Sequence, residues 1–210
     1  IQIQNSSGTD ITIDNVSVKE YLGQEVVPDS GCGSWLFEPQ STNLLAYSED
    51  FSNASWAKAE SSIIANTTTA PNGTLTASTL IPNVSGNLTT AGNASTNNRM
   101  LVQLVGAYTD VSNSIYVKSV SGSSFNFSAY VQVSDSIRGI NTVTVTNEWQ
   151  RVEVSALLLS EFNRFTLCTE ESVYIWGAQA EELTYATSYI PTEGSTVTRN
   201  QDVCNNGGSL

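Results

Sequence analysis

Apolar and polar side chains alternate with a period of two along most of this chain. Near its start, for example, Ile11 and Ile13 flank Thr12. Side chains of a β-strand point alternately to opposite faces, so this period indicates strands with one buried face. The pattern predicts strands at 114–118, 125–133, 142–146, 150–159, 162–168 and 173–180, with weaker candidates at 35–37, 43–47, 61–65, 75–80 and 100–105.

Turn residues separate these segments, and no segment carries a convincing helical period. Pro-Asn-Gly at 71–73, Ser-Gly-Asn at 85–87 and Gly-Ser at 122–123 are examples. Many short strands at regular spacing are typical of sandwiches and jelly rolls. We therefore expect an all-β fold, a jelly-roll β-sandwich of antiparallel strands.

The charge balance excludes some partners. The chain has 8 basic and 20 acidic residues, a net charge of −12, and no Lys/Arg cluster. Nucleic-acid binding needs a basic face to neutralise phosphates, so we expect no nucleic-acid partner. No apolar run reaches the roughly 18 residues of a membrane-spanning helix, so we expect no membrane insertion.

The three cysteines are Cys32, Cys168 and Cys204, and the chain has no histidine. Widely spaced cysteines without histidine do not predict a zinc site, and we expect no cofactor. Cys32 and Cys204 could form a disulfide if the two ends of the chain meet. Cys168 lies in an apolar stretch and is expected to be a buried thiol.

The residues do not favour catalysis. Without histidine, the commonest general base and nucleophile activator is absent. The acidic pairs are Glu49/Asp50, Glu170/Glu171 and Glu181/Glu182. Adjacent residues of a strand point to opposite faces, so the two acids of a pair cannot flank the same glycosidic bond as the carboxylates of a glycosidase do. We interpret these acids as solvated charges. We expect the protein not to be an enzyme.

An internal similarity suggests how the chain is organised. The segment 11–20 aligns with 173–182, since both are alternating strands that end in acidic residues. We expect residues 1–22 to be the terminal strand of a preceding similar module and 23–34 to be a linker. The domain would span 35–204, and 205–210 would lead into a further domain. The alternative is a chance similarity between two amphipathic strands.

Five motifs in order cover most of the chain. They are Leu-Phe-Glu-Pro-Gln-Ser-Thr-Asn-Leu-Leu at 36–45 with Tyr-Ser-Glu-Asp-Phe-Ser-Asn at 47–53, Thr-Ala-Pro-Asn-Gly-Thr-Leu-Thr-Ala at 69–77, Asn-Glu-Trp-Gln-Arg at 147–151, Tyr-Ile-Trp-Gly-Ala-Gln at 174–179, and Ala-Thr-Ser-Tyr-Ile-Pro-Thr at 186–192. Together they resemble phage tail-fibre and virion appendage proteins. The same pattern is similar to carbohydrate-binding modules of the galactose-binding-like jelly-roll group.

The resemblance implies a location on a virion surface or otherwise outside the cell, and a homotrimer that contacts other virion proteins. It also implies a structural calcium in some relatives, held by acids of the first and last strands. Asp50 matches the first of these acids, whereas Trp176 stands where the second is expected. By resemblance, the segment 10–20 is a candidate to complete the sheet of a neighbouring copy.

Sugar binding is the functional reading that the residues favour, because sugars stack on aromatic rings and bond to amides and charged groups. The candidates are Trp56, Tyr108, Tyr116 and Tyr130, with Gln132 and Arg138 nearby in the sequence. Alternatively, Tyr116 and Tyr130 pack in the core or across strands. Trp149 and Trp176 lie in strand motifs and are expected to be core residues.

Three functions remain open at this stage. The first is a virion appendage module that attaches to a host cell-surface glycan. The second is a carbohydrate-binding module of a secreted bacterial enzyme or an adhesin. The third is a purely architectural, trimerising spacer without a ligand. An exposed aromatic groove favours the first two, whereas a threefold interface that buries the aromatic residues favours the third.

Overall fold

The computed structural model describes residues 26–29, 32–35, 37–58, 61–83, 101–134 and 136–202. All regular elements in these ranges are β-strands, and all their pairings are antiparallel. The strands are β1 (Val26–Asp29), β2 (Cys32–Trp35), β3 (Ser41–Asn43), β4 (Ala57–Lys58), β5 (Ser61–Thr68), β6 (Ala77–Pro82), β7 (Leu101–Ser119), β8 (Phe125–Val133), β9 (Ser136–Val145), β10 (Gln150–Thr169), β11 (Val173–Glu181) and β12 (Val197–Arg199).

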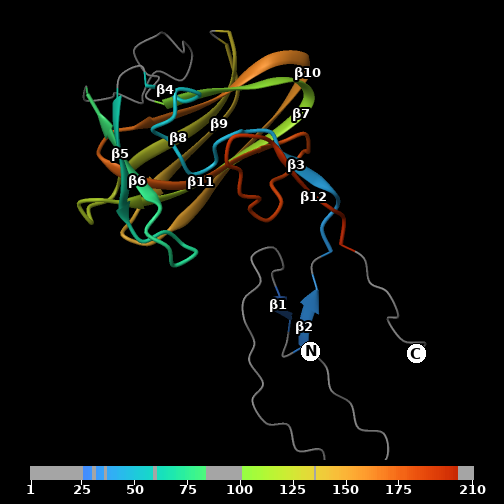
Figure 1. Ribbon diagram of the computed structural model, residues 1–210, viewed down its shortest axis with the longest axis horizontal. Coiled ribbons are helices and arrows are strands. Elements are labelled where there is room, and N and C mark those ends of the chain that lie inside the picture. Colours follow the sequence, from blue (N-terminus) through green and yellow to red (C-terminus); the bar gives the residue numbers. More distant parts are fainter. Residues whose placement is uncertain are drawn as a thin grey trace, which may run out of the picture.

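The main sheet has eight strands in the order β5-β6-β11-β7-β10-β8-β9, and β4 pairs with β7 outside this path. Two long strands, β7 and β10, take part in both layers of a sandwich (Figure 1). One layer holds β5, β6 and β11 against the C-terminal part of β7, and the other holds β8 and β9 against the C-terminal part of β10. The predicted all-β sandwich is confirmed.

A bend in β7 and β10 turns one layer into the other. The pairing of β10 with β7 shifts register between Leu157 and Glu161 and again between Asn163 and Arg164. Opposite the second shift, Gly106 of β7 has φ +141°, and the Asn163 side-chain amide donates to the Gly106 carbonyl at 2.8 Å. Extra residues in one strand bend it and increase its twist.

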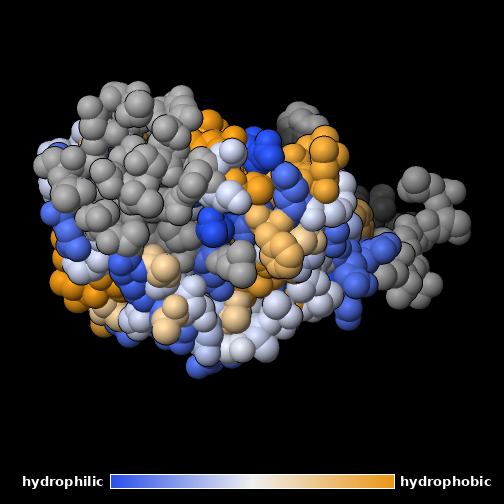
Figure 2. Space-filling model, turned by 90° about the horizontal axis from the view of Figure 1, so that it is seen from above, coloured by the Kyte–Doolittle hydropathy of each residue, from blue (hydrophilic) through white to orange (hydrophobic). Residues whose placement is uncertain are grey.

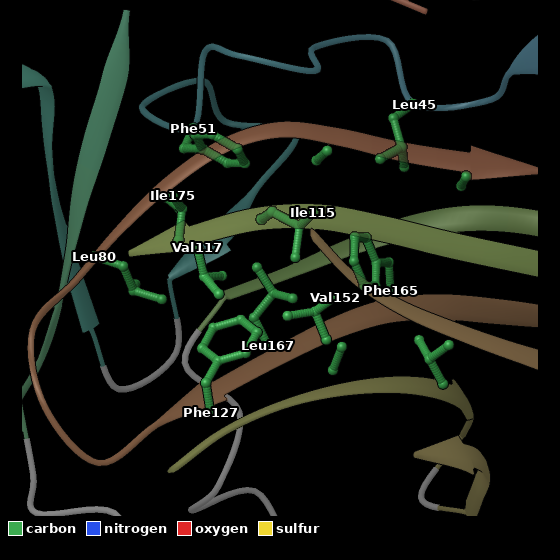
Figure 3. Packing of buried hydrophobic residues seen from close by; sticks show 14 of the residues in the cluster. Leu45, Phe51, Leu80, Ile115, Val117, Phe127, Val152, Phe165, Leu167 and Ile175 are labelled. Carbon is green, nitrogen blue, oxygen red and sulfur yellow. The ribbon is translucent and has the colours of Figure 1, made fainter. Parts of the chain in front are cut away.

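The hydrophobic core lies between the layers because the alternating apolar side chains of each strand face inward. Figure 3 shows Leu80, Val117 and Ile175 of one layer pointing toward Phe127 and Leu167 of the other. The segment between β3 and β4 closes one side of this core with three fully buried side chains, Leu45, Phe51 and Trp56.

Most expected strands are present, but several differ in their extent. The described residues of the segments 100–105 and 114–118, expected as two strands, both lie in the single strand β7, so that prediction was wrong. Of the segment expected at 35–37, Phe37 lies outside β2. The segments 150–159 and 162–168, expected as two strands, form the single strand β10, so that prediction was wrong. The segment expected at 43–47 is a strand only as far as Asn43, where β3 ends. In the segment 23–34, which was expected to be a linker, β1 pairs with β2, and β2 extends one residue further to Trp35.

The first and last described segments of the domain in sequence lie next to each other. β3 pairs with β12, and the two strands lie side by side in Figure 1. Just outside them, the Asp202 amide donates to the Glu38 carbonyl at 3.0 Å, and the Glu38 amide donates to the Asp202 carboxylate at 3.0 Å. Residues 1–25 and 203–210, with the proposed upstream strand, the tail and Cys204, lie outside the described residues, so a Cys32–Cys204 disulfide stays a prediction.

The predicted burial of Cys168 is confirmed, since its side chain is 1% exposed. Among the described residues no helix could cross a membrane.

Candidate functional site

A polar cleft of about 830 Å3 opens at the end of the sandwich where the β3–β4 segment meets the segment after β11. Its lining comes from three places in the sequence: the β3–β4 segment, the β5–β6 hairpin and the segment that precedes and begins β12. The lining residues are Tyr47, Glu49, Asp50, Ser52, Ala65, Asn66, Thr76, Pro191, Thr192, Glu193, Ser195 and Val197.

Hydrogen bonds that involve the backbone connect two walls of the cleft. The Thr192 amide donates to the Ser48 hydroxyl at 2.8 Å, and the Ser48 amide donates to the Thr192 carbonyl at 3.3 Å. Next to them Tyr47 and Glu193 form an antiparallel bridge, and Gly194 donates to the Ala46 carbonyl at 2.7 Å. These bonds hold the cleft in shape before any ligand enters, which lowers the ordering cost of binding.

A half-buried tyrosine, Tyr189, positions one of the acids in the cleft. The Tyr189 hydroxyl donates to the Glu49 carboxylate at 3.0 Å and shares a 2.6 Å hydrogen bond with the Ser48 hydroxyl. Burial, and next the nearby Glu49 carboxylate, raise the pKa of Tyr189 far above its usual value. Tyr189 therefore stays a hydrogen-bond donor at all ordinary pH values and fixes the orientation of Glu49.

A bulge in β5 brings an amide to the cleft. The pairing of β5 with β6 shifts register between Ile64 and Thr68, and Asn66 within this stretch has φ +55°. Asparagine tolerates this left-handed conformation better than most residues. Bulges redirect side chains, and this one places exposed Asn66 in the lining.

The cleft carries negative charge. Among the described residues, the charged side chains of its lining are those of Glu49, Asp50 and Glu193. The neighbouring Lys58 amine does not reach into the lining but donates to the Ser52 carbonyl at 2.9 Å and the Asn53 carbonyl at 2.6 Å. Burial lowers the pKa of Lys58, and the charge of Asp50 partly opposes this shift.

The cleft combines carboxylates, hydroxyls, an amide and one aromatic ring. These groups can accept and donate several hydrogen bonds at once to a ligand that carries many hydroxyls. Among the described residues, no group of three or more His, Cys, Asp or Glu side chains is placed to hold a metal ion. Asp50, the calcium candidate, instead accepts hydrogen bonds from the Ser52 amide, at 3.1 Å, and the Ser52 hydroxyl.

Three of the six sugar-binding candidates are buried. Trp56 is 1% exposed and packs against Phe51 in the core, with its indole N–H on the Tyr47 carbonyl at 2.9 Å. Tyr130 is 8% exposed and Gln132 is fully buried. Trp56 is therefore a core residue and not an exposed sugar-binding ring, so that candidate was wrong. For Tyr130, the structure agrees with the alternative that this residue packs in the core or across strands. Burial, followed by the effect of Cys168, raises the pKa of Tyr130.

Tyr116 belongs to an aromatic cluster on the face of β7 and β11 that points away from the main core. The centre of its ring lies 5.5 Å from that of Trp176, and the Trp176 ring centre lies 4.6 Å from that of Tyr189. The Arg151 guanidinium lies 5.6 Å from the centre of the Tyr116 ring. Trp176 is buried as expected, while Trp149 is only half-buried beside this cluster.

The remaining candidates, Tyr108 and Arg138, lie near the bend of β7 and β10. Tyr108 is half-buried and packs on the core, and exposed Arg138 pairs with Glu161 at 2.9 Å. Leu157, Leu159 and Phe162 of β10 are exposed here. Over the coloured part of Figure 2, apolar side chains are mixed with hydrophilic ones. The structure does not gather the six candidates into one site.

Sequence reasoning missed most of the cleft. Asp50 was named, but only for calcium; Tyr47, Glu49, Asn66, Glu193 and Ser195 were not named as sugar-binding residues. The motifs at 47–53 and 186–192 both border the cleft and were both noticed. What the sequence did not show is that these two motifs contact each other, because they are far apart in the chain. Ser48 and Thr192, which are hydrogen-bonded, are separated by 144 residues.

Comparisons with known proteins give distant structural similarities. No protein-family model matches the chain, and no curated protein matches it. Similar solved structures include the CBM22-1–GH10 modules of Clostridium thermocellum endo-1,4-β-D-xylanase 10B complexed with xylohexaose, at 11% identity and a TM-score of 0.46, covering 72% of this chain and 30% of that one.

Two further solved structures have similarly low sequence identities and TM-scores. A putative sugar-binding protein from Bacteroides thetaiotaomicron has 11% identity and a TM-score of 0.44, covering 66% of this chain and 92% of that one. A CBM4 structure has 12% identity and a TM-score of 0.39, and the match covers 60% of this chain and 83% of that one. Similarities of this size assign neither a ligand nor a site to this chain, so we base its function on its own residues.

Proposed function

We propose that this domain is a non-catalytic carbohydrate-binding module and that the cleft between the β3–β4 segment and the segment before β12 is its binding site. The observation that carries the proposal is the cleft itself, a preformed cavity of about 830 Å3 with a polar lining. Sites for small ligands commonly measure roughly 300–1,000 Å3.

The lining suits a ligand rich in hydroxyl groups. Carboxylates such as Glu49 and Glu193 accept two or more hydrogen bonds, and the Asn66 amide both donates and accepts. Tyr47 adds an aromatic ring. The hydrogen bonds between Ser48 and Thr192 keep the walls together, so little ordering is needed on binding.

The setting of the module is a separate part of the proposal. The motifs between 36 and 192 resemble phage appendage proteins as well as carbohydrate-binding modules, and we propose a virion appendage or a secreted enzyme or adhesin as the parent protein. A host cell-surface glycan is the proposed ligand in the first case. Weak binding at each site would then be strengthened by several copies in an oligomer.

Binding of the full chain to a panel of neutral, amine-bearing and acidic oligosaccharides tests the function. We expect saturable binding to at least one of them, and at least a tenfold loss of affinity for Tyr47→Ala, since that substitution removes the only aromatic side chain that the described residues contribute to the lining. Tyr185→Ala is the matched control, because Tyr185 is 51% exposed and lies outside the lining.

Binding that survives Tyr47→Ala but is lost with Tyr116→Ala or Tyr108→Ala would place the site elsewhere on the domain. Absence of binding to the whole panel, together with a defined trimer mass in light scattering, would favour the architectural spacer over a binding module.

A further inference from the structure

The charged side chains that line the cleft are all acidic. Glu49, Asp50 and Glu193 line it, and among the described residues no lysine or arginine belongs to the lining. The amine of Lys58, whose charge interacts with Asp50, is bonded to the Ser52 and Asn53 backbone carbonyls at 2.9 and 2.6 Å. The chain as a whole has a net charge of −12, which adds to the negative potential of the cleft.

The lining also contains a buried hydroxyl without a partner. Thr192 is 8% exposed, and among the described residues its Oγ1 has no hydrogen-bond partner. Buried polar groups are normally satisfied, and a hydroxyl can both donate and accept. A ligand in the cleft can supply the missing partner if the Thr192 side chain rotates toward it.

We propose that the cleft selects glycans by charge, and that it prefers sugars with a protonated amine over neutral sugars and rejects sugars that carry carboxylate, sulfate or phosphate. This inference rests on the proposed carbohydrate-binding function of the same site. An ammonium group donates charge-assisted hydrogen bonds to carboxylates, which are stronger than bonds between neutral groups. An acidic sugar instead meets like charges, with no basic side chain among the described lining residues to pair with.

Three hexasaccharides of different charge test the proposal on the full chain: glucosamine, N-acetylglucosamine and galacturonate oligomers. Calorimetric titrations are run at about pH 5.5, where ordinary carboxyl groups are ionised and aliphatic amines are protonated. We expect affinity to fall in that order. Raising the salt concentration should shrink the preference for the amine, because dissolved ions screen exposed charges.

Neutralising one acid should weaken the preference without harming the fold. Glu193→Gln is suitable because Glu193 is exposed, and we expect it to reduce the ratio of glucosamine to N-acetylglucosamine affinity by about two- to fivefold. Glu148→Gln, which removes an exposed acid outside the lining, should leave the ratio unchanged. Melting temperatures confirm that both variants are folded.

The outcomes separate the two proposals. Equal affinity for the three oligomers, or a ratio that Glu193→Gln does not change, overturns charge selection and leaves carbohydrate binding intact. Tighter binding of galacturonate also overturns it. Failure of every oligosaccharide in the wider panel overturns the binding function and, with it, the charge selection.

Discussion

Glu181 shows how a single charged residue is tolerated in this fold. Its side chain is fully buried, yet no cation contacts it among the described residues. Instead it accepts hydrogen bonds from the Ser41 hydroxyl at 2.5 Å, the Thr187 amide at 2.8 Å and the Thr187 hydroxyl. Such donors offset the cost of removing a carboxylate from water. The interpretation of Glu181 as a solvated charge was therefore wrong, whereas its neighbour Glu182 is exposed.

Gly139 is required by a close approach of two strands. A Cβ atom at this position would lie 2.6 Å from the Ser155 carbonyl oxygen of β10. Two positions further along β9, the Asn141 amide donates to the Glu153 carbonyl at 2.8 Å. These contacts bring the outer edge of β9 against β10 and cover an edge that would otherwise be open.

Gly139→Ala should destabilise the protein by about 1–3 kcal/mol, the usual cost of overpacking. The clash is with backbone, which cannot rotate away, so β9 and β10 must separate. Urea unfolding measures the loss, and hydrogen exchange should show faster exchange in β9. Gly122→Ala is the comparison, because a Cβ there has no neighbour within 4 Å and adds only the strain of φ +78°. Unchanged stability and unchanged exchange for Gly139→Ala would contradict the close approach.

Among the elements, β10 decides the shape of the sandwich. It is 20 residues long and pairs with β7 along most of its length, then with β8 near its end. At its bend Leu159 and Ser160 have φ values of +52° and +64°, a conformation that costs side-chain-bearing residues about 1 kcal/mol or more. The strand can therefore change layers without a loop.

Leu159→Gly should raise the free energy of unfolding by up to about 1 kcal/mol, because glycine adopts positive φ without strain. Leu159 is 78% exposed, so little packing is lost. Leu157→Gly is the matched control: Leu157 is also exposed but pairs with Asp110 in the regular ladder. There glycine should lower stability by about 0.5–1 kcal/mol. Denaturant midpoints decide the test, and a loss of stability in both variants would count against strain at the bend.

For the whole molecule, contacts between distant segments hold the two ends of the chain in place. β3 and β12 form their own small sheet, and Arg199 pairs with Glu38, which is 6% exposed. Glu38 also accepts a hydrogen bond from the Ser188 amide at 2.7 Å. This junction adjoins the segment 191–197 that forms one wall of the cleft.

Arg199→Met should lower stability by about 3 kcal/mol, since it leaves the buried Glu38 carboxylate without its counter-charge. Arg138→Met tests the same substitution at the exposed Arg138–Glu161 pair, whose side chains are 42% and 40% exposed, and should cost less than about 1 kcal/mol. Thermal and urea unfolding compare the two. Similar losses in both variants would mean that Glu38 is not effectively buried.

A feature could be predicted from the sequence when residues close together in the chain determine it, and not when contacts between distant segments do. The strand at 125–133 was predicted with the bounds that β8 has, because alternation is a property of neighbouring residues. The continuity of β10 was missed, because a bulge with positive φ looks like a break in the pattern. Trp56 was misplaced, because nothing in its neighbours shows that the segment around it folds back onto Phe165.

The sequence by itself determined the fold class, since a two-residue period of apolar side chains has one efficient solution, strands that bury a common face. It also determined the acidic character of the chain. Only the tertiary structure decided which aromatic rings are buried and where the cleft lies. The walls of the cleft come from segments near residues 47 and 192, and their meeting depends on how both layers pack, which no local pattern encodes.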